Sequence, residues 1–259
     1  MSGKILLQRE GVVATIVLSH PGRLNALSLP MWRAVASTIE SLNADPSLRC
    51  VVLRGDGERA FAAGADIAEF ASERSNSTQA RVYGDAIDRG MQAVRTSVHP
   101  TLAMIQGACV GGGLELAAVC DMRICGESSR FGVPVKNLGL VMGLGELQGL
   151  IGLVGRARAL EIVLEGRVFG AAEAKDMGLV NRVVPDAELA AECAATVARI
   201  ASGAPLVARW HKAFANRLAD PRPLQDDELA QNHACFDTED FRIGYQAFLA
   251  KKTPTFEGR

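Results

Sequence analysis

The residues in this sequence that could bind a ligand or catalyse a reaction lie in two glycine-bearing turns. The first reads Ala-Phe-Ala-Ala-Gly-Ala-Asp over residues 60–66, and the second reads Gly-Gly-Gly-Leu-Glu-Leu over residues 111–116. Each turn follows a strand-like run and precedes a helical pattern. Glycines let the backbone N–H groups of such turns point at a ligand, and a helix that begins after Gly111 adds the positive end of its dipole. The turns therefore predict an anion site.

Glu115 is the only polar side chain between Gly111 and Cys120. A helix that is apolar on all sides is buried, and an unpaired buried carboxylate is costly. Burial raises a carboxyl pKa toward neutrality, where a general acid or base is most effective. Glu115 is therefore the predicted catalytic carboxylate. The alternatives are a structural pairing with an arginine such as Arg123 and, for the three glycines, close packing of the helix on a strand.

The elements that must hold these turns are predicted by hydrophobic patterns. Apolar runs typical of buried strands lie at residues 12–18, 50–53, 101–105, 122–125 and 179–184. Ser28 is a good N-cap for an amphipathic helix that Asn43 and Pro46 end. Because strands and helices alternate, residues 1–190 are predicted to form a wound, mostly parallel α/β core that carries the site.

The pattern changes after Pro185. Helical patterns follow one another at residues 188–201, 205–219, 224–236 and 238–251, without a strand pattern between them. Residues 191–259 are therefore predicted to be a helical C-terminal region for oligomerisation and site closure. Apolar side chains that a small appendage cannot bury favour an oligomer: Phe214, Leu218, Phe236, Phe241 and Phe248. The polar stretch 72–78 is predicted to be a mobile surface loop bordering the site.

Composition excludes several classes of function. The 28 lysines and arginines nearly balance the 29 aspartates and glutamates. The chain therefore has no net positive charge that would attract nucleic acid or an anionic membrane. Neither the six cysteines nor the four histidines have zinc-binding spacing, so no metal is expected. Lys4 and Arg9 interrupt any signal-peptide core, and no run reaches the roughly 18 apolar residues of a membrane span, so a cytoplasmic protein is expected. Absent GxSxG and Walker A patterns argue against a hydrolase nucleophile and a phosphotransferase.

The two turns together resemble the paired motifs of the crotonase superfamily, also called the enoyl-CoA hydratase/isomerase family. The resemblance covers essentially the whole chain and extends through residues 130–134, 164–167, 171–174, 178–185, 236–240 and 247–251. It implies an α/β fold with a crotonase-like wound ββα core and a C-terminal all-helical region. It also implies a coenzyme A thioester as substrate, with no separate cofactor, and a homotrimer or hexamer.

The resemblance also implies roles for single residues. The backbone N–H groups of Ala65 and Gly112 would form an oxyanion hole for the thioester carbonyl. Asp66 is expected to be a structural cap and not a catalyst, because an anion there would oppose the oxyanion. Ala68 stands where relatives often carry a phosphate-binding lysine. Positions implied to contact substrate or coenzyme A are Arg23, Leu24, Ala63, Asp66, Ile67, Val135, Leu140, Phe248 and Lys251.

One position departs from the pattern of family hydratases, because Val135 stands where a second glutamate follows Phe-Gly-x-Pro. Hydration is easiest with two carboxylates, whereas double-bond isomerisation needs only one. Glu146 is a candidate substitute, and the alternative is that it merely stabilises the first turn of a helix. The sequence therefore leaves open an enoyl-CoA hydratase or isomerase, an acyl-CoA decarboxylase or hydrolase, and a catalytically dead acyl-CoA-binding relative.

Overall fold

The protein is built around an open six-stranded sheet. A computed structural model describes residues 3–259. The strand order is β1-β2-β3-β5-β7-β10. Its strands are β1 (Lys4–Glu10), β2 (Val13–Ser19), β3 (Cys50–Gly55), β5 (Thr101–Ile105), β7 (Met122–Gly126) and β10 (Arg182–Val184). Only β1 and β2 pair antiparallel. Parallel strands are covered on both faces, which is why the central ones read as continuous apolar runs.

A second sheet of four short strands lies over the ends of the first. Its order is β4-β6-β8-β9, with β4 (Ala60–Ala62), β6 (Ala108–Val110), β8 (Arg130–Gly132) and β9 (Phe169–Gly170). Three of these strands follow a strand of the first sheet after a few residues, so the chain winds in ββα units. Gly107 permits one such turn, because its φ is +67° and an added Cβ would lie 2.0 Å from the Arg59 carbonyl oxygen. The predicted wound, mostly parallel α/β core is confirmed.

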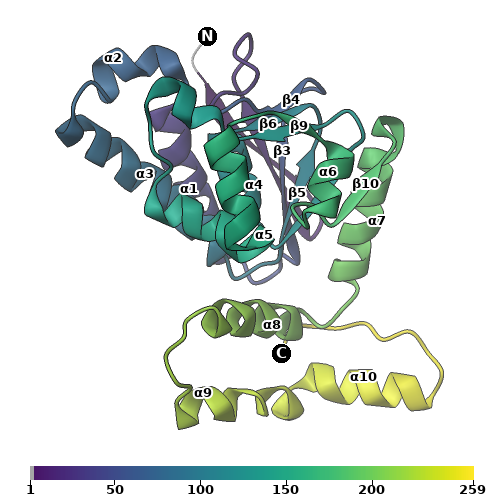
Figure 1. Ribbon diagram of the computed structural model, residues 1–259. Coiled ribbons are helices and arrows are strands. Elements are labelled where there is room, and N and C mark those ends of the chain that lie inside the picture. The colour runs from purple at the N-terminus through teal and green to yellow at the C-terminus, as the bar shows by residue number, and fades with distance from the viewer. Residues whose placement is uncertain (1–2) are drawn as a thin grey trace.

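Helices cover both faces of this core (Figure 1). On one side pack α1 (Leu29–Asn43), α3 (Ser77–Arg95), α4 (Gly112–Ala118) and α5 (Leu144–Glu165). On the other, α7 (Leu189–Ala201) packs Leu189, Cys193 and Val197 against the sheet. Short helices connect these elements: η1 (Ile67–Glu69), α2 (Phe70–Glu73), η2 (Pro134–Leu138), α6 (Ala171–Asp176) and η3 (Asp186–Glu188). The side chain of Ser28 caps α1 by accepting from the Met31 N–H, as predicted.

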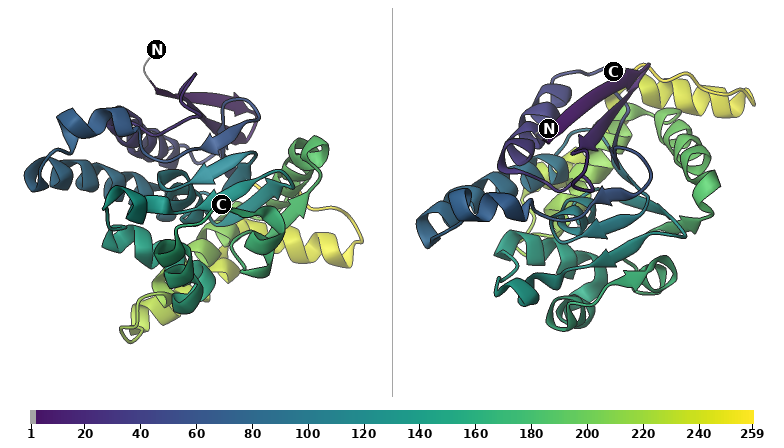
Figure 2. Two further views of the ribbon diagram at one scale, coloured as in Figure 1. Left: turned by 45° about the horizontal axis from the view of Figure 1, so that its top comes forward. Right: turned by 90° about the horizontal axis from the view of Figure 1, so that it is seen from above.

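The remaining helices stand apart from the body and form the C-terminal region. They are α8 (Pro205–Leu218), α9 (Asp226–Gln231), η4 (Ala234–Asp237) and α10 (Glu239–Leu249). In both views of Figure 2 the yellow α10 projects beyond the sheets. Residues 191–259, all of which the structure describes, contain no strand. Because α7 belongs to the sheet packing, the helices that leave the core begin with α8 and not at residue 190.

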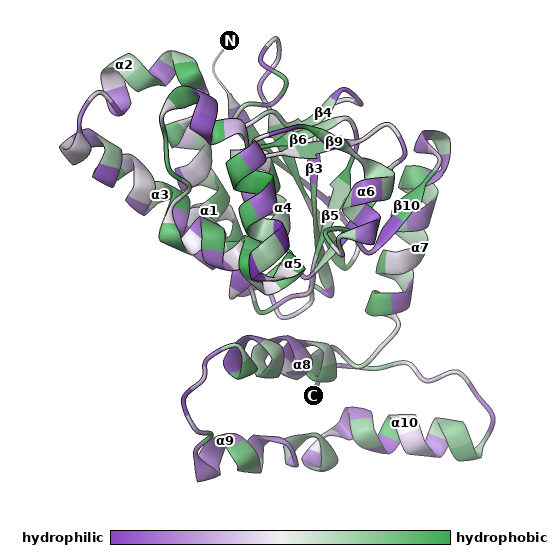
Figure 3. Cartoon of the chain, in the orientation of Figure 1, coloured by the Kyte–Doolittle hydropathy of each residue, from purple (hydrophilic) through white to green (hydrophobic). Residues whose placement is uncertain are grey.

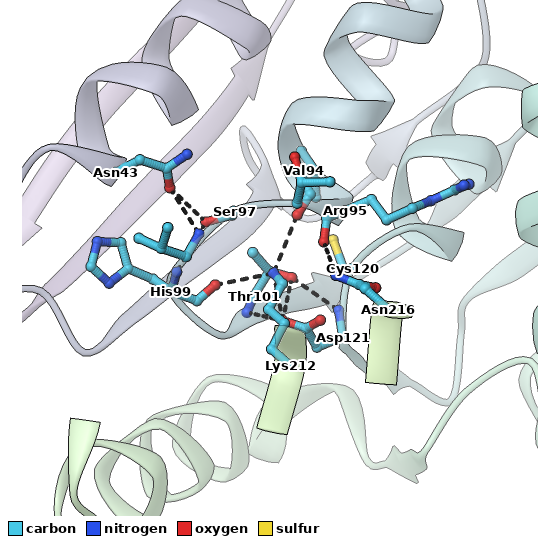
Figure 4. A network of polar contacts seen from close by, with 12 residues as sticks. Asn43, Val94, Arg95, Ser97, His99, Thr101, Cys120, Asp121, Lys212 and Asn216 are labelled. Atoms are coloured by element: carbon cyan, nitrogen blue, oxygen red, sulfur yellow. Dashed lines mark hydrogen bonds and ion pairs between the residues drawn. The ribbon is translucent and has the colours of Figure 1, made fainter. Parts of the chain in front are cut away.

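A buried lysine attaches α8 to the core (Figure 4). Lys212 Nζ lies 2.9 Å from Asp121 Oδ2 and donates to the carbonyl oxygens of Val94 and His99 at 3.3 and 3.1 Å. One turn further along α8, Asn216 donates to the Arg95 carbonyl at 2.9 Å. The attachment is therefore polar and directional.

Within residues 3–259, none of the helices is both long and apolar enough to cross a membrane.

Candidate active site

The two glycine-bearing turns border one cavity of about 120 Å³. Its walls come from the β4–η1 turn, the start of α4, η2 and the first turns of α5. Most of the predicted site residues line it: Ala63, Ala65, Ile67, Gly112, Glu115, Val135, Leu140 and Glu146. Residues from three separate ββα units thus meet at one place.

Ala65 presents its backbone N–H away from its neighbouring strand. Leu27 and Ala65 form an isolated parallel bridge. In that bridge the Leu27 N–H donates to Gly64 O at 2.7 Å, and the Asp66 N–H donates to Leu27 O at 2.9 Å. Successive N–H groups of an extended segment point to opposite sides. The Ala65 N–H is therefore turned away from Leu27 and is left for a ligand in the cavity that Ala65 lines.

Gly112 contributes the second amide. It is the first residue of α4, where backbone N–H groups have no carbonyl one turn earlier, and Glu115 is the residue that bonds back to Gly111 O at 2.9 Å. A Cβ added at Gly112 would lie 3.7 Å from Ala65 N, 3.7 Å from Glu115 Oε2 and 3.3 Å from Trp32 Cζ2. The second amide, the first amide and the carboxylate therefore surround the same small space.

Gly111 and Gly113, on either side of Gly112, are glycines for structural reasons. Gly113 packs against β4 so closely that an added Cβ would lie 2.2 Å from the Ala62 carbonyl oxygen. Gly111 has a φ of +50°, which favours glycine. Close packing thus explains Gly113, whereas the space beside Gly112 opens to the cavity.

Glu115 is 5% exposed. Burial raises the pKa of its carboxyl well above the ordinary value, the negative charge of Glu146 raises it further, and Arg74 opposes both effects. The structural pairing with Arg123 is wrong. The Arg123 guanidinium instead donates to the carbonyl oxygens of Leu179 at 2.9 Å and Ala117 at 3.2 Å. Glu115 is therefore a buried carboxyl group with a raised pKa and without an arginine partner among residues 3–259.

Glu146 fits both of its alternative roles. Its Oε2 accepts from the Gly143 N–H at 2.6 Å, so it stabilises the first turn of α5. It also lines the cavity with Glu115. Burial raises the pKa of its carboxyl, the Gly143 N–H lowers it, Asp88 raises it and Arg74 lowers it. The structure therefore brings a second carboxylate into the site from a position eleven residues beyond Val135, as their numbers show.

Arg74 is a site residue that the sequence analysis missed. It lies between α2 and α3, and of the described residues that line the cavity it is the one cation. Its guanidinium carbon lies 4.9 Å from the ring centre of Phe70 and 4.7 Å from that of Tyr83. The polar stretch 72–78 does border the site, but helices α2 and α3 occupy its two ends. The spacing of polar residues there gave no signal of which one faces inward.

The positions predicted to contact coenzyme A do not lie together in the structure. Arg23 and Asp66 line a neighbouring hollow, with 3.8 Å between Arg23 Nη1 and Asp66 Oδ1. Asp66 also caps η1 by accepting from the Ala68 N–H at 3.2 Å, as expected. The Leu24 carbonyl accepts from the Ala63 N–H at 3.0 Å, next to the turn that carries Ala65. Phe248, 83% exposed on α10, and Lys251 just after it line neither hollow within residues 3–259, and their role stays a prediction.

Comparison with known proteins gives one consistent match. Residues 8–259 match the family model described as Enoyl-CoA hydratase/isomerase. A Mycobacterium tuberculosis protein named "Probable enoyl-CoA hydratase" is 37% identical over 98% of each chain. A crotonyl-CoA hydratase from Syntrophomonas wolfei is 33% identical over 97% of each chain.

Solved structures agree with this match over the whole length. The crystal structure of an enoyl-CoA hydratase/carnithine racemase from Magnetospirillum magneticum superposes with a TM-score of 0.97 at 49% identity, over 98% of this chain and 96% of that one. An enoyl-CoA hydratase from Bacillus anthracis gives a TM-score of 0.90 at 33% identity, over 99% and 100% of the two chains.

Proposed function

Because the chain belongs to the enoyl-CoA hydratase/isomerase family of enzymes, we propose that it adds water to the double bond of an enoyl-CoA thioester. The observation that carries this proposal is the meeting of two carboxylates, Glu115 and Glu146, in the cavity bordered by the Ala65 and Gly112 amides. Relatives that bear hydratase names support the choice of reaction.

The two amides stabilise the negative charge that develops on the thioester oxygen. When a nucleophile attacks C3 of the conjugated thioester, the electron pair of the double bond moves toward the carbonyl and forms an enolate. Two fixed N–H donors aimed at that oxygen need no reorganisation as the charge appears. One such donor typically contributes about 3 kcal/mol, or ~10²–10³ in rate. Ala65 and Gly112 thus make the enolate accessible.

The two carboxylates handle the protons. The ionised member of the pair removes a proton from water as its oxygen bonds to C3, and the protonated member delivers a proton to C2. One water is consumed, and the pair again holds one proton. Buried like charges that interact strongly favour such a shared proton, and the raised pKa values of both glutamates agree with it. Glu146 would then do the work of the second glutamate, whose position Val135 occupies in this chain.

Isomerisation of a 3-enoyl-CoA is the second candidate reaction. A Cβ added at Gly112 would lie 3.7 Å from Glu115 Oε2, so this carboxylate oxygen is the one nearest to Gly112. A single base so placed could move one proton between C2 and C4 of a substrate whose enolate the amides hold. This reaction would not need Glu146. Decarboxylation, thioester hydrolysis and simple acyl-CoA binding are the further alternatives.

Turnover of two substrates distinguishes these functions. Crotonyl-CoA is offered for hydration and a 3-enoyl-CoA for isomerisation, and the products are identified by mass spectrometry. We expect 3-hydroxybutyryl-CoA from crotonyl-CoA, with Glu115→Gln and Glu146→Gln each slowing its formation by ~10²–10⁴. Glu73→Gln is the matched control, because Glu73 is exposed on α2, lies outside the cavity lining and does not shift the pKa of either glutamate. If Glu146→Gln leaves hydration unchanged, the two-carboxylate mechanism is wrong.

The assembly and the coenzyme A site belong to the same proposal. Arg23 and Leu24 would contact the coenzyme A portion, and Phe248 and Lys251 would approach a site only once chains associate. Large apolar side chains are exposed on η4 and α10, including Phe236, Phe241, Tyr245 and Leu249. Covering them in a homotrimer or hexamer would remove this apolar surface from water.

A further inference from the structure

Trp32 buries a hydrogen-bond donor that the protein does not use. The side chain lies on α1 and is 0% exposed. Its indole Nε1–H finds no acceptor among residues 3–259. A buried donor without a partner costs about 1–3 kcal/mol. Such a cost is expected to be offset by a ligand when the donor borders a binding site.

The orphan donor lies on the same edge of the indole as Cζ2, the ring atom that packs beside Gly112. Trp32 lines the cavity, and its Cζ2 lies 3.3 Å from a Cβ added at Gly112. Cζ2 and Nε1 are both bonded to Cε2, so they share that edge. The benzo side of the ring is held in place, because a Cβ added at Gly90 would lie 3.0 Å from Trp32 Cε3. The N–H direction is therefore fixed by packing.

We propose that Trp32 contacts the reacting oxygen, donating its indole N–H to the oxygen that becomes bonded to C3. This inference rests on the proposed hydration. The Ala65 and Gly112 amides already serve the thioester oxygen, so the indole is free for another acceptor. Glu115 Oε2 borders the same space. A water that gives its proton to a carboxylate keeps two lone pairs, one to attack C3 and one to accept from Nε1. The same oxygen is the hydroxyl of the 3-hydroxyacyl product.

A binding comparison tests the contact without turnover. Affinities of 3-hydroxybutyryl-CoA and butyryl-CoA, which differ by that hydroxyl, are measured by calorimetry with the wild-type Trp32 and with Trp32→Phe, both in a Glu115→Gln background so that the hydroxylated ligand is not dehydrated. We expect the chain that keeps Trp32 to prefer the hydroxylated ligand, and Trp32→Phe to reduce that preference about tenfold. Trp210→Phe is the matched control, because Trp210 is the only other tryptophan of the chain and lies on α8. It should keep the wild-type ratio.

A second measurement covers the case in which Trp32→Phe folds poorly. With two tryptophans in the chain, the indole N–H resonances are two, and Trp210→Phe assigns them. We expect the Trp32 resonance to move downfield with 3-hydroxybutyryl-CoA and to stay near its free position with butyryl-CoA. Equal shifts with both ligands in the Glu115→Gln background would by themselves overturn the proposal, as would an unchanged affinity ratio in Trp32→Phe.

Turnover separates this inference from the hydration proposal itself. If wild type does not hydrate crotonyl-CoA but the hydroxyl preference depends on Trp32, the contact stands and the proposed reaction fails. If wild type hydrates, we expect Trp32→Phe to slow hydration about tenfold while 3-enoyl-CoA isomerisation, which uses no water, keeps its rate. Equal loss in both reactions contradicts a contact with the added oxygen.

Discussion

Gly112 and Gly113 are adjacent in the sequence but border different surroundings, and this difference can be measured. A methyl group at Gly112 enters the space between the two amides and Glu115, whereas one at Gly113 collides with the Ala62 backbone. We expect Gly112→Ala to lose ~10²–10³ in kcat/KM but to lower the melting temperature less than Gly113→Ala, because its methyl group would meet the Trp32 ring at 3.3 Å and no backbone atom closer than 3.7 Å. Gly113→Ala should instead lower the melting temperature by several degrees. The reverse pattern would show that the roles are wrongly assigned.

Burial of Glu115 makes stability depend on pH. In the unfolded chain the Glu115 carboxyl loses its proton at about pH 4.3. In the folded chain its raised pKa keeps it protonated to higher pH. Over that window the folded state holds more protons, so rising pH favours unfolding. Glu115→Gln removes this penalty. We expect it to raise the melting temperature relative to wild type by more at about pH 8 than at about pH 5. A pH-independent difference would contradict a buried, protonated Glu115.

Arg74 lowers the pKa of both glutamates. Its replacement by methionine should raise the pKa of both glutamates and so move the acid limb of the kcat/KM profile to higher pH. Activity should recover as pH rises. Arg74→Lys, which keeps the charge, should restore the profile, and Arg81→Met, at an exposed position on α3, should leave it unchanged. An unshifted limb in Arg74→Met would limit Arg74 to stacking on Phe70 and Tyr83.

The sequence identified site residues whose surroundings are local, and it missed those that depend on folding. Glu115 was predictable because its own helix is otherwise apolar, and Ala65 because its turn motif resembles a family pattern. Glu146 was only one of two alternatives, since its distance from Glu115 depends on how α5 packs on α4. Trp32 fits an ordinary core position in the α1 pattern. Its orphan N–H arises from the packing of Gly90 and Gly112 around it.

At the scale of elements, long apolar strands were predictable and short ones were not. The strands β2, β3, β5 and β7 fall on the predicted runs. The three-residue strands β4, β6 and β8 lie inside or beside glycine-bearing turns and make no periodic pattern. Only pairing with one another defines them as a sheet. The exposed β1 was also missed, because its polar residues hide the alternation.

The attachment of α8 predicts a stability effect. Lys212→Met removes the ammonium group that bridges Asp121 and two carbonyl oxygens. We expect a loss of about 1–3 kcal/mol in unfolding free energy, because buried carbonyls lose their donor while Asp121 keeps its bonds from Thr101. Chemical denaturation measures it, and exposed Lys252→Met is the control. Equal stability of the two variants would show that Lys212 does not anchor α8.

At the scale of the whole molecule, the C-terminal region is where large apolar side chains such as Phe248 and Leu249 are exposed. Figure 3 shows green, hydrophobic segments along α8, α9 and α10 as well as purple ones. We expect sedimentation velocity to give a trimer or hexamer of the 27.5 kDa chain. Replacing exposed Phe248 by aspartate should shift the distribution toward smaller species. A monomer at all concentrations in wild type would contradict this expectation.

The central claim is that two backbone amides hold one oxygen beside two carboxylates. A crystal structure of Glu115→Gln with bound crotonyl-CoA tests it most directly. The thioester oxygen should lie about 3 Å from both Ala65 N and Gly112 N, with C2 and C3 facing residues 115 and 146. A thioester oxygen bound away from these amides, or a Glu146 carboxylate remote from both carbons, would contradict the account.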